Sequence, residues 1–166
     1  MKSIVILSGK GGVGKSSITA SLAVSFSKEN KIVCADCDVD ASNLSLLFAL
    51  SEDKYASWEK LSTNKIAIIV TEPTPSGFSD LKKAIEVVDH FKIKKSIIIN
   101  KYDINPSFVN ELEEYAKKNS IKIIAKIPFD KNFIKAMTEM KPIISFNKKY
   151  EKMFDEIKKE ILFEIK

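Results

Sequence analysis

The sequence predicts an α/β protein with a mainly parallel sheet of about five strands, and three observations support this fold class. Short runs rich in isoleucine and valine alternate with segments whose apolar residues recur at helical spacing. The short runs are almost continuously apolar, as in parallel strands that are covered by helices on both faces. The chain has 166 residues, enough for one substantial core, so we expect a single domain over residues 1–166.

The predicted elements follow one another in a regular order along the chain. The apolar runs predict strands at residues 3–8, 31–36, 65–70, 95–100 and 121–128. The amphipathic segments predict helices at residues 15–28, 41–50, 79–91, 105–119, 130–140 and 148–165. The first helix has Ile18, Leu22 and Phe26 at helical spacing, and the helix from residue 105 has a proline near its start, where proline favours helix initiation.

Charge and hydropathy favour a water-soluble protein that does not bind nucleic acid. The net charge is +5, every basic residue is a lysine, and the lysines are interleaved with aspartate and glutamate. The absence of arginine disfavours nucleic-acid recognition, because readers of nucleic acid depend on its bidentate contacts. No apolar run is long enough for a transmembrane helix, and the N-terminal run stops after a few residues, as a buried strand does and a signal peptide does not. We therefore expect a cytoplasmic protein.

The cysteine and histidine content gives little support for a metal centre. Cys34 and Cys37 form a CxxC pair, but the chain has no second pair, and its single histidine, His90, is distant in sequence. A closed zinc or iron–sulfur site needs about four such ligands. We expect two reduced thiols, no iron–sulfur cluster within one chain, and a surface histidine at a helix C-terminus.

The C-terminal segment has a continuous apolar face, formed by Tyr150, Met153, Phe154, Ile157, Ile161 and Ile165. Such a face packs against the protein's own sheet or, in an amphipathic surface helix, against a membrane. Acidic residues on the polar face favour packing on the sheet, so membrane binding is not expected.

A glycine-rich loop follows the first predicted strand and opens the first predicted helix. Its sequence, GKGGVGKS over residues 9–16, fits the pattern G-x-x-x-x-G-K-[ST]. The glycines let successive N–H groups point at phosphate oxygens, and the helix N-terminus adds positive potential. Lys15 is placed to reach the β- and γ-phosphates, and the Ser16 hydroxyl to bind Mg²⁺. The loop predicts a P-loop NTPase-like three-layer sandwich that binds a nucleoside triphosphate with Mg²⁺.

Two further polar motifs follow predicted strands, where α/β proteins place ligand-binding residues. The first, DCDVD, holds Asp36, Asp38 and Asp40, and an aspartate here can act as a general base or simply cap the loop. The second is NKYD over residues 100–103. It fits the N-K-x-D guanine motif, in which Asp103 would bind the N–H donors of guanine, so a GTP-binding protein is one alternative.

The loop contains a second lysine, Lys10, and with it the stretch GKGGVGKSS resembles the deviant Walker A loop of the MinD/ParA/Mrp/NifH class of ATPases. Further stretches resemble, in the same order, the MinD-superfamily ATPases that carry an inserted ferredoxin domain: CADCDVDASNL, VTEPTPSGFSDLKKAIEVVDHF, IINKYDIN, AKIPFDKNFIKAM and KPI. The resemblance covers about residues 1–50 and 66–146.

The resemblance implies an ATP site and assigns residues to it. The phosphates would be bound by Gly9, Lys10, Gly11, Gly12, Val13, Gly14, Lys15, Ser16 and Ser17. Lys10 would reach the partner's nucleotide across an ATP-dependent homodimer, which matters because the chain has no arginine to serve as a finger. Asp38 would orient the attacking water or reach Mg²⁺ through water. The catalytic residues would then be Lys10, Lys15 and Asp38. Asn100 would hydrogen-bond adenine, with Pro128 and Phe129 lining the base pocket.

The chain departs from this subfamily in one region. Between the second-strand motif and TEPTPSG the subfamily has a long additional segment, which includes the ferredoxin insert and the Walker B strand, whereas residues 51–64 stand here in place of both. The Walker B aspartate normally holds a water on Mg²⁺. The strand that ends in Glu72 would offer a substitute if it lay beside the first strand, whereas the family register makes it the next strand along, with Glu72 lining the rim.

Three functions remain at this point. The first is slow, Mg²⁺-dependent ATP hydrolysis in a nucleotide-controlled switch, and the second is a non-hydrolysing nucleotide-binding scaffold. The third is GTP binding through Asn100 and Asp103. Phosphoryl transfer is catalysed by positioning and electrostatics, so the loss of a Walker B aspartate should slow it severely.

Overall fold

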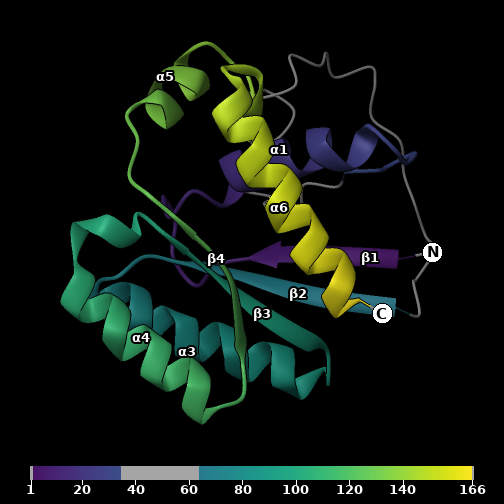
Figure 1. Cartoon of the computed structure of the whole chain (residues 1–166). Helices are drawn as coiled ribbons and strands as arrows, with labels where there is room; N and C mark the ends of the chain where they lie inside the picture. Colours follow the sequence, from purple (N-terminus) through teal and green to yellow (C-terminus); the bar gives the residue numbers. More distant parts are fainter. Residues whose placement is uncertain (1, 35–63, 166) are drawn as a thin grey trace. The chain divides into compact units, whose positions relative to one another are not determined.

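The computed structural model describes residues 2–34 and 64–165, whose helices and strands are shown in Figure 1. By its internal contacts the chain divides into two compact units. The first comprises residues 1–15, 62–130 and 161–166, and the second comprises residues 16–61 and 131–160. The first unit contains the sheet and is the one that positions the candidate site.

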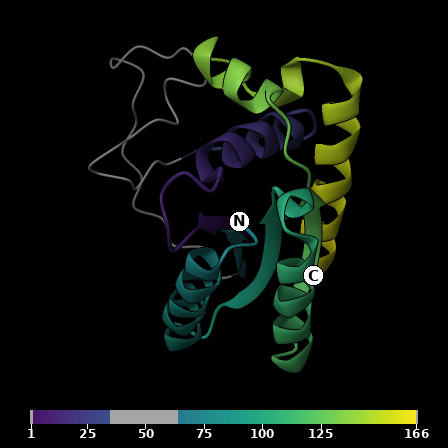
Figure 2. The ribbon, with the colours of Figure 1, turned by 90° about the vertical axis from the view of Figure 1, so that its left-hand side faces the viewer.

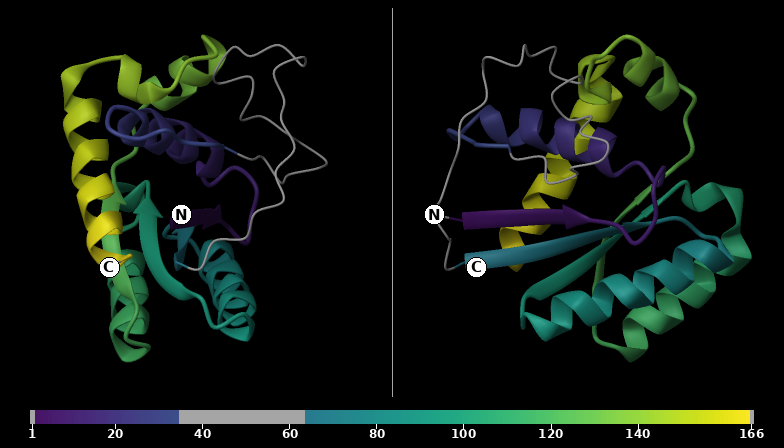
Figure 3. Two further views of the ribbon diagram at one scale, coloured as in Figure 1. Left: turned by 90° about the vertical axis from the view of Figure 1, so that its right-hand side faces the viewer. Right: turned by 180° about the vertical axis from the view of Figure 1, so that it is seen from behind.

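Among the described residues, the sheet has four parallel strands, which lie in the order of the sequence. They are β1 (Lys2–Leu7), β2 (Asn64–Thr71), β3 (Lys94–Asn100) and β4 (Lys122–Ile127). Figure 3 shows β1 and β2 side by side from behind. The predicted α/β fold with a parallel sheet is confirmed, and four of the five predicted strands are present, each bound within one residue of the predicted one.

The prediction of a strand at residues 31–36 is wrong for residues 31–34, which are the ones that the structure describes. Residues 31–34 have no regular secondary structure, and residues 35 and 36 lie outside the described part of the chain. Ile32 and Val33 are exposed, so their apolar side chains do not contribute the burial that a covered parallel strand gains. The neighbour of β1 is instead β2, with Leu7 opposite Ile69 in the register.

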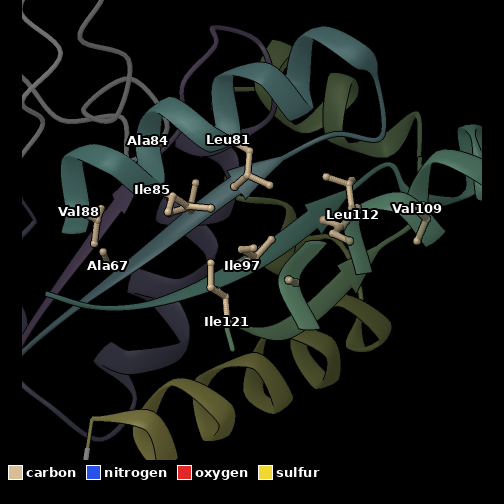
Figure 4. Close-up of a cluster of buried hydrophobic side chains, with 12 residues drawn as sticks. Ala67, Leu81, Ala84, Ile85, Val88, Ile97, Val109, Leu112 and Ile121 are labelled. Carbon is tan, nitrogen blue, oxygen red and sulfur yellow. The ribbon is translucent and has the colours of Figure 1, made fainter. Parts of the chain in front are cut away.

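Two helices cover one face of the sheet: α3 (Pro75–His90) and α4 (Pro106–Lys118). Figure 2 shows both on the same side of the sheet. Their buried side chains meet those of the strands in one apolar cluster (Figure 4), formed by Ala67, Ile69, Leu81, Ala84, Ile85, Val88, Ile97, Ile99, Val109, Leu112, Ala116 and Ile121. Alternate residues of β2 and β3 enter this cluster because successive side chains of a strand point to opposite faces.

Local capping decides where α3 and α4 begin. The Thr74 side chain accepts a hydrogen bond from the Gly77 N–H at 3.0 Å, and Pro75 occupies the first helical position. Helix α3 therefore begins four residues before the predicted Ser79. The Asn105 side chain accepts from the Phe108 N–H at 3.2 Å, and α4 begins at the following proline as predicted.

The second unit contains α5 (Asn132–Thr138), most of α1 (Lys15–Ser27) and most of α6 (Lys148–Glu164). Polar contacts join α1 to α6: the Ser25 hydroxyl donates to Asp155 at 2.5 Å, and Lys28 just beyond α1 pairs with the same carboxylate at 3.1 Å. The pKa of Asp155 lies below its ordinary value, mainly because its carboxylate accepts the hydrogen bond from Ser25.

Five of the six residues of the predicted apolar face of α6 are buried, including Tyr150, Phe154 and Ile157, and Met153 is partly buried. Its edge meets α5, where the rings of Phe133 and Tyr150 pack edge to face with centroids 6.1 Å apart. Among the described residues, no helix is long and apolar enough to cross a bilayer.

The last turn of α6 belongs to the first unit and is tied to the amino ends of two strands. The Glu164 carboxylate pairs with Lys94 of β3 at 2.9 Å and with Lys122 of β4 at 3.1 Å. The hydrogen bond from Lys94, reinforced by Lys122, holds the pKa of Glu164 below its ordinary value of 4.5. A carboxyl whose pKa is lowered on folding stabilises the protein while it is ionised.

We expect the variant Glu164→Gln to unfold more easily than the wild type at pH 7. The difference in unfolding free energy should shrink as the pH falls below about 4.5 and through the lowered folded-state pKa, because the wild-type carboxyl then takes up a proton. Urea unfolding between pH 3 and pH 7, followed by circular dichroism, measures this difference. The exposed Glu156→Gln serves as the charge-matched control, and a pH-independent difference for Glu164→Gln would contradict the expectation.

Candidate nucleotide-binding site

The glycine-rich loop leaves the carboxyl end of β1 and enters α1 at Lys15. Gly12 and Gly14 have φ values of 78° and 95°, in the left-handed region that other residues rarely adopt. Ser16 and Ser17 follow Lys15 in the first turn of the helix, where backbone N–H groups have no partner within the helix. The strand–loop–helix context that the motif requires is therefore present, with glycines at the two positions whose backbone needs them.

The buried side-chain amide of Asn100 holds the middle of the loop in place. The Asn100 side chain, at the end of β3, is 6% exposed and donates a hydrogen bond to the Val13 carbonyl at 2.8 Å. Val13 itself is 2% exposed, so it anchors the middle of a loop whose preceding residues, 9–12, are exposed. The sequence predicted that Asn100 lies near the nucleotide, but it gave no sign of this bond, because the two residues are 87 positions apart.

One carboxylate beside the loop, that of Glu72, forms ion pairs with two lysines. Glu72 follows β2, and its Oε1 lies 3.5 Å from the Nζ of Lys10, while its Oε2 lies 3.0 Å from the Nζ of Lys101. Lys10 also donates to the Ser76 hydroxyl at 3.1 Å, and the Lys101 Nζ lies 3.5 Å from the Gly12 carbonyl. Cationic side chains from the loop and from the end of β3 thus converge on the end of β2.

The turn that carries Glu72 is fixed by its own hydrogen bonds. The Thr71 hydroxyl donates to the Gly77 carbonyl at 3.0 Å, and the Thr74 N–H donates to the Glu72 carbonyl at 2.8 Å. A Cβ on Gly77 would lie 2.5 Å from the Glu72 carbonyl oxygen, so only glycine fits there without a shift. The stretch TEPTPSG therefore forms a tight turn that presents Glu72 and Ser76 to Lys10.

A second close approach joins the loop to α3. A Cβ on Gly9 would lie 2.3 Å from the Asp80 carbonyl oxygen, closer than real Cβ atoms come. The chain has five glycines, four in the loop and the fifth at Gly77. All the glycines of the sequence thus lie in the loop or in the TEPTPSG turn.

The two expected base-pocket segments are joined by one hydrogen bond. Asp103 lies in a 3₁₀ turn, Tyr102–Ile104, and its Oδ1 accepts the Phe129 N–H at 2.6 Å. Phe129 is 42% exposed and follows Pro128 just beyond β4. One oxygen of the carboxylate that a guanine would need is therefore engaged by the backbone.

Four predicted residues lie outside the described part of the chain, one lies as expected, and the structure decides between the two positions left open for Glu72. Asp36, Cys37, Asp38 and Asp40 lie outside the described residues. His90 lies in the last turn of α3, as predicted. The strand that precedes Glu72, β2, pairs directly with β1, so the family register that made it the next strand along is wrong among the described residues. This is the arrangement in which the Glu72 carboxylate becomes a candidate for the metal site. Sequence reasoning missed the pairing of Glu72 with Lys101, because no local pattern links them.

We expect Gly9→Ala to destabilise the protein by about 1–3 kcal/mol, because its new methyl group meets the Asp80 backbone. Gly11→Ala is the matched control in the same loop. No atom lies within 4 Å of a Cβ at that position, so its stability should be unchanged or slightly raised. Urea unfolding of both variants without nucleotide measures the difference. Equal stabilities for the two variants would contradict the close packing of the loop on α3.

Comparison with known proteins begins with two relatives from Methanocaldococcus jannaschii. An uncharacterized protein is 63% identical over 51 residues, which cover 31% of this chain and 18% of the relative. An uncharacterized ATP-binding protein is 36% identical over 112 residues, which cover 67% of this chain and 40% of the relative. The chain thus spans less than half the length of these curated relatives.

Solved structures show the same fold at low sequence identity. The cell division ATPase MinD of Pyrococcus furiosus matches with a TM-score of 0.79 at 19% identity, over 98% of both chains. The septum site-determining protein MinD of Pyrococcus horikoshii, complexed with Mg-ADP, matches with a TM-score of 0.78 at 19% identity, over 96% of this chain and 95% of that one. Residues 4–143 match the domain family itself. The chain therefore belongs to the CobQ/CobB/MinD/ParA nucleotide binding domain family.

Proposed function

We propose that the protein binds ATP with Mg²⁺ at residues 9–17 and acts as a nucleotide-controlled switch that hydrolyses ATP slowly. The observation that carries this proposal is the loop between β1 and α1, with its two left-handed glycines and its lysines at positions 10 and 15. The structural relative from P. horikoshii is complexed with Mg-ADP, and one curated relative is described as ATP-binding, which supports the same ligand here.

The chemistry of the loop fits a magnesium nucleotide. Mg²⁺ prefers oxygen ligands and commonly keeps one hydroxyl or carboxylate besides the phosphates, and Ser16 supplies a hydroxyl in the first turn of α1. When bound, the ion would neutralise charge that develops on the phosphates. Lys15 would contact the β- and γ-phosphates, and Asp38 would position the attacking water. In a homodimer, Lys10 would contact the nucleotide of the second copy.

Binding is supported more directly than turnover. Glu72, a carboxylate beside the loop, is engaged by Lys10 and Lys101. While this pairing lasts, Glu72 is not an unpaired ligand for metal-bound water, which favours the second candidate function, a nucleotide-binding scaffold that turns over little or not at all. The two functions share the site and differ only in the hydrolytic step.

We expect Lys15→Ala to weaken the binding of Mg-ATP by about 10- to 100-fold, because a hydrogen bond between charged groups is lost. Isothermal titration calorimetry measures the affinity. Lys83→Ala removes the same charge from the surface of α3, where Lys83 pairs with Asp80, and should leave the affinity unchanged. Equal affinities for the Lys15→Ala variant and the wild type would place the nucleotide elsewhere.

A single-turnover assay of ATP hydrolysis separates the two candidate functions. Hydrolysis by the wild type that is lost in Asp38→Ala supports the enzyme, and tight ATP binding without hydrolysis supports the scaffold.

We expect Asp103→Asn to leave ATP affinity unchanged. Asparagine keeps an oxygen that can accept the Phe129 N–H, so the turn is preserved, whereas the carboxylate that guanine N–H groups would require is lost. Titration of both nucleotides into the wild type and the variant measures the preference. A wild type that prefers GTP, and loses that preference in the variant, would establish the guanine alternative in place of ATP.

A further inference from the structure

We propose that Glu72 is a positioning residue that holds Lys10 and Lys101 at the phosphate loop and competes with phosphate for both of them. The proposal rests on the proposed function, since it concerns the same site. In this proposal the TEPTPSG turn binds the Lys10 side chain through Glu72 and Ser76 until the oxygens of a bound anion replace these contacts.

The first argument is the arrangement of charges. The Glu72 side chain is 15% exposed and lies between two ammonium groups, at 3.5 Å from Lys10 and 3.0 Å from Lys101. A single carboxylate neutralises only one of two lysines, so the pair keeps an excess positive charge. Carboxylate and phosphate oxygens satisfy the same lysine donors, which makes Glu72 an internal substitute for a phosphate group.

The second argument is that the carboxylate is built into a fixed position. The turn is closed by the bond from Thr71 to Gly77 and by the bond from Thr74 to the Glu72 carbonyl. The same turn presents the Ser76 hydroxyl, which accepts from Lys10 at 3.1 Å. Lys10 is therefore held by two groups from one rigid turn, although its side chain remains 43% exposed and within reach of an incoming ligand.

The third argument is the backbone of Lys101. Four described residues other than glycine have positive φ: Lys92, Lys101, Ser120 and Met140. The other three each lie two residues beyond the end of a helix, where this conformation is common. Lys101, with φ of 56°, instead follows β3 directly. A strained residue at a strand end is held by its surroundings. The Lys101 carbonyl accepts the Ile104 N–H at 3.2 Å, and the Lys101 side chain contacts Glu72 and the Gly12 carbonyl.

These contacts predict a competition. A triphosphate brings several negative charges to a loop where one carboxylate already binds two lysines. Its oxygens should displace Glu72 from Lys10 and Lys101, and Lys10 then becomes free to contact a second copy of the chain. Removing the carboxylate should accordingly loosen both lysines in the absence of nucleotide and strengthen the binding of phosphate.

The first test needs no nucleotide. The full chain is treated briefly with an amine-reactive ester, and mass spectrometry measures the labelling rate of each lysine. We expect Glu72→Gln to raise the rates of Lys10 and Lys101 by about two- to fivefold. Ser76→Ala should raise the rate of Lys10 alone, and the exposed Glu86→Gln, which removes the same charge from α3, should change neither. Unchanged rates in Glu72→Gln would overturn the proposal.

The second test measures competition with inorganic pyrophosphate and with ATP, each with and without Mg²⁺, by calorimetry. We expect Glu72→Gln to bind both anions about two- to fivefold more tightly than the wild type, and Glu86→Gln to bind like the wild type. Weaker binding of ATP by Glu72→Gln only when Mg²⁺ is present would identify Glu72 as a metal ligand and overturn the competition. If no variant binds either anion while the labelling pattern is as expected, the proposed function fails and the positioning of the lysines stands.

Discussion

The parallel register that joins β1 to β2 and β2 to β3 is the constraint on which the candidate site depends. Because the strands run in the same direction, the phosphate loop, Glu72 and Asn100 all lie at the carboxyl ends of the strands, on one side of the sheet. The Asn100 amide can then reach under the loop to Val13, and Glu72 can reach Lys10. A strand inserted between β1 and β2 would separate Glu72 from the loop by the width of one strand, about 4.8 Å.

Close backbone approach is the second physical theme of the site. The loop needs left-handed φ at Gly12 and Gly14, while Gly9 and Gly77 are needed because a side chain would strike neighbouring backbone. These are different reasons for the same residue type, one conformational and one steric. The loop can therefore lie close to α3, and its Lys10 lies within contact distance of Glu72 and Ser76 in the TEPTPSG turn.

The charges of the site follow from a sequence that uses lysine as its only strong base. A lysine ammonium is a compact charge on a flexible stem, without the planar geometry of arginine, and it exchanges partners readily. Such a group can pair with a carboxylate in one state and a phosphate in another. The pairing of Lys10 and Lys101 with one glutamate is therefore the contact that, in our proposal, a nucleotide would replace.

The sequence by itself determined the features that depend on neighbouring residues. These include the alternation of strands and helices, the glycine-rich loop with Lys15 at the start of α1, and the proline-led start of α4, because periodicity, backbone freedom and capping act over a few positions. Only the tertiary structure decided that β2 is the neighbour of β1, that residues 31–34 form no strand, and that Glu72 binds two lysines. The partners in the site are 29, 62 and 87 positions apart, and contacts across such distances are set by sheet pairing, which no local pattern records.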